Sequence, residues 1–184
     1  MAATESRMNE LGTKAPDFNL YDTVDNKMKN LKELKGKKAT VVLFICNHCP
    51  YVIHINHELV NTANDFIPKG ISFIAISSND VVNYPQDSPE KMKETADENN
   101  YPFPYLYDET QEVAKAYGAE CTPDIFIYDS NLKLVYRGQF DNSRPKNNEP
   151  ITGKDLRNAL SAIVEGRTVD QTQIPSIGCS IKWK

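Results

Sequence analysis

The run ATVVLFI, at residues 39–45, constrains the fold more than any other part of the chain. Its apolar residues do not alternate with polar ones, which is typical of a strand buried on both faces of a sheet. A second such run, ISFIAIS, occupies residues 71–77, and the apolar positions between them follow helical spacing from Pro50 to about Phe66. Two buried strands joined by a helix are expected to be parallel, with a right-handed crossover. The pattern predicts an α/β protein.

Weaker turn and helix signals add further elements around these two strands. Two antiparallel hairpins are predicted near the two ends, the second with a turn at Asp129-Ser130-Asn131. The elements expected are strands at 17–21, 27–29, 124–128 and 132–137, and helices at 89–99, 111–117 and 154–164. Pro102 and Pro104 bracket a stretch expected to be irregular. The resulting fold is a three-layer α/β/α domain spanning 1–184, with an N-terminal β-hairpin extension, a mixed central sheet and a polar tail, 168–184, wrapping the surface.

Composition limits the classes of function. A chain of 184 residues with 40% hydrophobic and 25% charged residues is expected to form one domain with a substantial core. A formal charge of −4 without a basic stripe argues against nucleic-acid binding. No apolar run approaches the roughly 18 residues of a membrane span. The first residues lack the apolar centre of a signal peptide, so a cytoplasmic, reducing location is expected.

The four cysteines are too few for a disulfide scaffold, and two of them form the pair Cys46-x-x-Cys49. The pair lies where the first buried strand leads into the helix, and Pro50 fits best at the first helical position, which makes Cys49 the capping residue. Free N–H groups and the positive end of the helix dipole stabilise a thiolate there. Cys49 is the predicted nucleophile and Cys46 its nearest disulfide partner. His48 is a candidate for additional positive charge.

A zinc site is the competing interpretation of this segment. Cys46 and Cys49 with His54 and His57 read C-x2-C-x4-H-x2-H, and zinc accepts two thiolates and two imidazoles. Structural zinc sites usually take their second ligand pair from a separate element at longer spacing. No metal is therefore expected, and both histidines are expected at partly exposed helix positions.

Several spaced segments together resemble the alkyl hydroperoxide reductase/thiol-specific antioxidant superfamily of thioredoxin folds. They are GTKAPDFNL (12–20), LKELKGK (31–37), VVLFICNHCPYV (41–52) and CTPDIFIYD (121–129). CNHCPYV and the ending IGCSIKWK look like a bacterial subfamily described as thiol-disulfide isomerase, thioredoxin-like or peroxiredoxin-like proteins. The resemblance implies that Cys49 is the attacking cysteine. It also implies that Thr122-Pro123 is a cis-proline turn that faces Cys49 and offers its backbone to substrate.

The chain departs from both patterns in this superfamily. Val42 and Cys46 stand at the two positions that define the peroxiredoxin motif before its reactive cysteine. Pro123 stands where peroxiredoxins are expected to have the arginine that polarises the peroxide. Val52 stands at the position of the second cysteine of thioredoxins, and Leu43 stands at the position of their buried acidic residue.

The resolving partner must therefore differ from the thioredoxin one. Cys46 is expected to resolve, with Cys121 as the remaining candidate. Cys179 is expected to be a buried small hydrophobe or a further disulfide partner. Arg137 and Arg144 are expected to be solvated, the alternative being that they approach the site.

The resulting hypothesis is a thiol-disulfide oxidoreductase in which Cys49 attacks a disulfide and Cys46 resolves the mixed disulfide. The alternative is a thiol peroxidase in which Cys49 becomes a sulfenic acid. A second alternative is a non-catalytic redox-sensing or zinc-binding module. The expected partners are a protein or small-molecule disulfide and an electron-donating dithiol, with no cofactor, nucleic acid or membrane.

Overall fold

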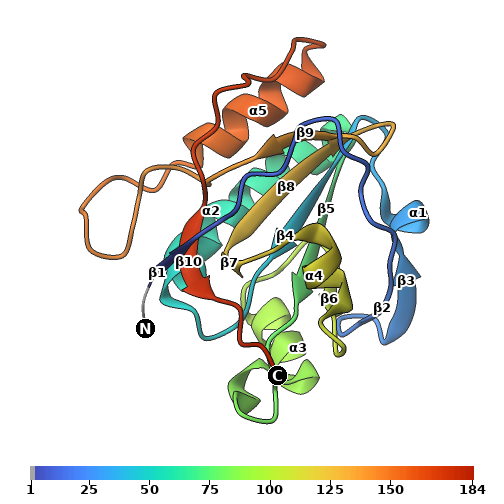
Figure 1. Cartoon of the computed structure of the whole chain (residues 1–184), viewed down its shortest axis with the longest axis vertical. Helices are drawn as coiled ribbons and strands as arrows, with labels where there is room; N and C mark the ends of the chain where they lie inside the picture. Colours follow the sequence, from blue (N-terminus) through green and yellow to red (C-terminus); the bar gives the residue numbers. More distant parts are fainter. Residues whose placement is uncertain (1–2) are drawn as a thin grey trace.

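A seven-stranded sheet forms the centre of the computed structural model, which describes residues 3–184 (Figure 1). Its strands are β2 (Asn19–Asp22), β3 (Lys27–Asn30), β4 (Ala39–Phe44), β5 (Ile71–Ser77), β6 (Tyr105–Tyr107), β8 (Asp124–Asp129) and β9 (Leu134–Arg137). Across the sheet they lie in the order β3-β2-β6-β5-β4-β8-β9. β5 is parallel to β4 and β6, whereas the other pairs are antiparallel. The expected mixed sheet is confirmed.

Helices cover both faces of this sheet. They are α1 (Leu31–Leu34), α2 (Pro50–Phe66), α3 (Pro89–Glu98), α4 (Glu112–Tyr117) and α5 (Lys154–Val164). Alternate residues of β4 enter two separate apolar clusters: Val41 and Leu43 pack in the cluster with α2, α3 and α5, and Val42 and Phe44 in the one with α1 and α4. Because β4 is buried on both faces, its sequence shows no alternation. The three-layer α/β/α architecture is confirmed.

The crossover from β4 to β5 follows the sequence pattern closely. α2 begins at Pro50, as expected for proline at the first helical position, and ends in a short 3-10 turn at Ile67–Lys69. Gly70 then adopts a left-handed conformation, φ 91°, and β5 begins at the next residue. The N-terminal hairpin β2–β3 joins the sheet through β6, a strand that follows the proline-bracketed stretch and was not predicted.

A second, smaller sheet was also not predicted. It has three antiparallel strands, β1 (Ala3–Glu5), β10 (Ile177–Ser180) and β7 (Cys121–Thr122), with β10 in the middle (Figure 1). The tail 168–184, which was expected to wrap the surface, contributes the strand β10 to this sheet. Gly178 permits the close pairing, because a Cβ there would lie 1.9 Å from the Thr122 carbonyl oxygen.

Within residues 3–184, no helix is both long and apolar enough to cross a membrane.

Candidate functional site

Cys49 lies at the junction between β4 and α2, as the sequence predicted. Its backbone is extended, with φ −72° and ψ 120°, and its carbonyl oxygen accepts hydrogen bonds from the N–H groups of Val52 and Ile53, each at 3.0 Å. Its side chain does not cap the helix. The thiol instead donates to the carbonyl oxygen of Thr122, 3.1 Å from Sγ, and is fully buried.

Cys46 and Cys49 have opposite acidities. The pKa of Cys49 is lowered to about 5, chiefly because the Cys46 side chain hydrogen-bonds to it and further because Cys179 and Thr122 do so. The pKa of Cys46 is raised well above its ordinary value by that same hydrogen bond, by burial and by the negative charge of Asp87. Cys49 is therefore the more acidic thiol of the pair, and Cys46 the one that keeps its proton to higher pH.

The cause of the low pKa differs in part from the one inferred from sequence. The helix N-terminus was expected to stabilise the thiolate, but the backbone contribution, from Val52, is smaller than that of the neighbouring side chains. Cys46 thus acts first as a hydrogen-bond donor to Cys49.

This cause can be tested by the rate at which iodoacetamide alkylates Cys49. Because only the thiolate reacts, we expect the rate to rise with pH and to be half-maximal near the pKa of about 5. Cys46→Ala removes the main donor and should move the midpoint upward, whereas Cys46→Ser keeps a donor and serves as the matched control. A wild-type midpoint near about 8.5, the value for a free cysteine, would contradict the assignment.

A buried carboxylate organises the other side of the cysteine loop. Asp87, fully buried in the 3-10 turn Pro85–Asp87, accepts hydrogen bonds from the Asn47 N–H and the Asn79 side-chain amide, each at 2.8 Å. His48 Nδ1 lies 2.6 Å from Asp87 Oδ2, and the His48 ring stacks on Tyr84. These contacts fix the orientation of His48 beside the pair of cysteines. Asp87 lies in a polar segment forty residues further along the chain, so no local signal marked it.

The zinc set considered from sequence does not come together. His54 Nε2 lies 2.7 Å from the Ser143 hydroxyl, and His57 is exposed beside Asn61. Among residues 3–184, Cys46, His48 and Asp87 form a group of three possible metal ligands, whose ligand atoms all lie within 4.8 Å of one another. They are the residues that could hold a metal ion.

Thr122 is the point at which the separate elements of the site meet. Its peptide bond to Pro123 is cis, as the resemblance implied. Its hydroxyl lies 3.5 Å from Cys46 Sγ, while its carbonyl accepts the Cys49 thiol. Cys179 is its partner in the β7–β10 register. One residue therefore contacts or opposes three of the four cysteines.

Cys121 is placed differently from the other cysteines. Successive side chains of a strand point to opposite faces, and the Thr122 side chain lies on the face of β7 toward Cys46. The Cys121 side chain therefore points to the other face. Its thiol donates to the carbonyl oxygen of Pro123, 3.6 Å away, and burial raises the pKa of this thiol. The orientation of its side chain makes Cys121 a poorer partner for Cys49 than Cys46.

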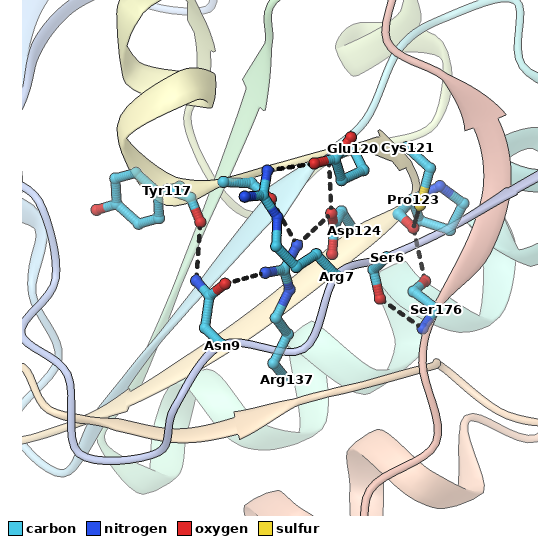
Figure 2. Close-up of polar contacts among 11 residues, drawn as sticks. Ser6, Arg7, Asn9, Tyr117, Glu120, Cys121, Pro123, Asp124, Arg137 and Ser176 are labelled. Carbon is cyan, nitrogen blue, oxygen red and sulfur yellow. Dashed lines mark hydrogen bonds and ion pairs between the residues drawn. The ribbon is translucent and has the colours of Figure 1, made fainter.

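Arg137 is a buried structural residue, and the expectation that it would be solvated is wrong. Figure 2 shows its guanidinium group between Asp124 and Asn9, with N···O distances of 3.0 and 2.6 Å, and it also donates to the Gly118 carbonyl. Both side chains of the Arg137–Asp124 ion pair are fully buried. The Arg144 guanidinium donates to oxygens of Asp141, Ser143 and Gln139. Arg144, which is half-buried, lines a small cavity together with Tyr51 and Pro123, whereas the Arg137 guanidinium is engaged by Asp124 and Asn9.

Comparison with known proteins gives a family and several relatives. The sequence model of the AhpC/TSA family matches residues 11–137. The curated protein "Putative peroxiredoxin Rv2521" from Mycobacterium tuberculosis is 29% identical over 129 residues, which are 70% of this chain and 75% of that protein. The thiol-disulfide oxidoreductase ResA of Bacillus thuringiensis subsp. konkukian is 25% identical over 134 residues, 72% of this chain and 71% of that protein.

Solved structures are similar to the chain over its whole length or nearly so. One of them is the crystal structure of an uncharacterized conserved protein from Geobacillus kaustophilus, with 60% sequence identity and a TM-score of 0.98. The similarity covers 100% of this chain and 97% of that one.

Proposed function

The chain belongs to the AhpC/TSA family, and we propose on this basis that it is an oxidoreductase acting on thiols and disulfides through Cys49 and Cys46. The observation that carries the proposal is that both sulfurs lie against Thr122 of the cis-proline turn, with Cys49 Sγ 3.1 Å from its carbonyl oxygen and Cys46 Sγ 3.5 Å from its hydroxyl. The opposite directions of the two pKa shifts support it. Disulfide exchange needs one sulfur that attacks as a thiolate and a second that stays protonated until the first has reacted. Cys49, at the N-cap of α2, and Cys46, three residues before it, fit these roles.

The reaction begins with attack of the Cys49 thiolate on one sulfur of a substrate disulfide. A bond forms between that sulfur and Cys49, the substrate disulfide breaks, and one substrate thiolate leaves. Cys49 then no longer carries a negative charge and no longer accepts a hydrogen bond from Cys46. These are the two effects by which Cys49 raises the pKa of Cys46. Cys46 can now lose its proton and attack Cys49, which releases the second substrate thiol and leaves a Cys46–Cys49 disulfide. An electron-donating dithiol reduces this disulfide again.

A thiol peroxidase is the second candidate, and the name of the Mycobacterium tuberculosis relative favours it. A peroxidase requires the same reactive thiolate, which would become a sulfenic acid. The two arginines considered for polarising a peroxide both have other partners. The Arg137 guanidinium is held by Asp124, Asn9 and Gly118, and the Arg144 guanidinium donates to Asp141, Ser143 and Gln139. Disulfide exchange is therefore the better-supported reaction.

The two candidates are separated by the substrate that the reduced protein prefers. We expect its rate with hydroxyethyl disulfide to exceed that of a free thiol at the same pH by roughly 10²-fold or more, because Cys49 is ionised and its partner is in place. Its rate with hydrogen peroxide should be no higher than that of the free thiol. Stopped-flow measurement of both rates tests this. A peroxide rate far above the free thiol that disappears in Cys49→Ser would instead establish the peroxidase.

A further inference from the structure

Three cysteine side chains surround Thr122, and one of them comes from the C-terminal strand. Cys49 and Cys46 contact the carbonyl and hydroxyl of Thr122, at 3.1 and 3.5 Å. Cys179 lies directly opposite Thr122 in the antiparallel β7–β10 pair. Side chains opposite one another in such a pair share a face, with Cα atoms about 4.5–5.5 Å apart. All three cysteines are buried in the apolar core on the α2 side of the sheet.

We propose that Cys179 is a second disulfide partner of Cys49, so that oxidation can join the start of α2 to strand β10. This inference rests on the proposed function, because it requires Cys49 to be the attacking thiolate. It assigns a redox role to a residue that lies 130 positions away from Cys49 along the chain.

The position of β10 is fixed from both sides, which keeps Cys179 near Cys49. Ser176, just before β10, donates a hydrogen bond to the Pro123 carbonyl at 2.6 Å, and its own N–H is bound by Ser6 (Figure 2). Beyond β10, the N–H of Lys182 donates to the Asn79 side chain at 2.9 Å. A strand held in this way presents Cys179 to the site in a defined geometry.

The charges near the two candidate partners differ in a way that favours Cys179. The carboxylate of Asp87 raises the pKa of Cys46, and this charge remains after Cys49 has reacted. The pKa of Cys179 is raised to about 12 by burial and by the contact with Cys49 and its charge, whereas the charge of Lys182 lowers it. Once Cys49 is in a mixed disulfide its charge is gone, and Lys182 still favours the Cys179 thiolate.

The step balances without a further reagent. Cys49 thiolate attacks a disulfide RSSR, which forms Cys49–S–R and releases one thiolate. Cys179 passes its proton to solvent and attacks Cys49 Sγ, which forms the Cys49–Cys179 bond, breaks the bond to R and releases the second thiolate. The two cysteines supply two electrons to the substrate, and a dithiol donor returns them.

The experiment uses the full chain with Cys46→Ser, treated with one equivalent of hydroxyethyl disulfide. Intact mass distinguishes a protein that keeps a mercaptoethanol adduct from one that has lost two hydrogens. Trypsin places Cys49, Cys121 and Cys179 in three peptides, 39–69, 116–133 and 168–182. We expect loss of the adduct and a disulfide between peptides 39–69 and 168–182. The same cross-linked pair is expected as a fraction of oxidised wild type.

Matched double variants decide which sulfur is responsible. Cys46→Ser/Cys179→Ser should keep the adduct, whereas Cys46→Ser/Cys121→Ser should lose it. A lasting adduct on Cys49 in Cys46→Ser, or a link to peptide 116–133 instead, overturns the role of Cys179 and leaves the proposed function standing. Failure of Cys46→Ser to react at all, with Cys49 still reduced, would overturn the proposed function and the inference with it.

Discussion

Replacement of Cys49 by serine is expected to lower the turnover of hydroxyethyl disulfide, with a dithiol donor, by at least about 10³-fold. A serine hydroxyl stays protonated at neutral pH and forms no disulfide, so neither the attack nor the mixed disulfide remains possible. The fold should be unchanged, because serine is similar to cysteine in size and its hydroxyl can donate to the Thr122 carbonyl oxygen, which lies 3.1 Å from Cys49 Sγ. The expected loss is therefore chemical and not structural.

The measurement is steady-state turnover of the purified variant, with circular dichroism and a thermal melt to confirm folding. Cys46→Ser is the informative comparison, since it removes a neighbouring thiol but keeps the Cys49 nucleophile. Turnover in Cys49→Ser at a level near that of wild type would mean that another cysteine attacks the substrate, and the assignment of the nucleophile would be wrong.

Replacement of Arg137 by methionine is expected to lower the free energy of unfolding by about 3–5 kcal/mol. Both members of the Arg137–Asp124 pair are fully buried, and the guanidinium also contacts Asn9, the Gly118 carbonyl and the Phe126 ring. Methionine leaves the buried carboxylate without its counter-charge and several acceptors without a donor.

Urea unfolding provides the measurement. Arg167→Met is the matched control, because the ion pair of Arg167 with Glu165 is largely exposed and should be worth no more than about 1 kcal/mol. The double variant Arg137→Met/Asp124→Asn should lose less stability than the sum of the two single variants, since it removes both charges together. A loss in Arg137→Met no greater than that in Arg167→Met would contradict a stabilising role for the buried pair.

The parts of the site that depend on neighbouring residues could be predicted from sequence. The apolar run of β4, Pro50 and the helical spacing after it located Cys49 at the start of α2, because each signal lies within a few residues of the structure it determines. Thr122-Pro123 was located by resemblance, and the cis bond is observed.

The parts that depend on distant contacts could not be predicted. Asp87 reaches the cysteine loop from a polar 3-10 turn, and its role depends on Asn47 and Asn79 rather than on its own neighbours in sequence. β10 is a four-residue strand whose pairing depends on β1 and β7, at opposite parts of the chain. For the same reason the burial of Arg137 was missed, because its partners Asn9, Gly118 and Asp124 are brought together only by the fold.

The three-stranded sheet has a practical consequence for handling the protein. β1 begins at Ala3 and pairs with β10, and β10, which carries Cys179, ends at Ser180. An affinity tag, fluorophore or surface linkage at either terminus would pull directly on the strands that hold Cys179 beside Cys49. Attachment through the exposed loop 145–150 would leave that sheet free, and redox measurements on immobilised protein are best made in that way.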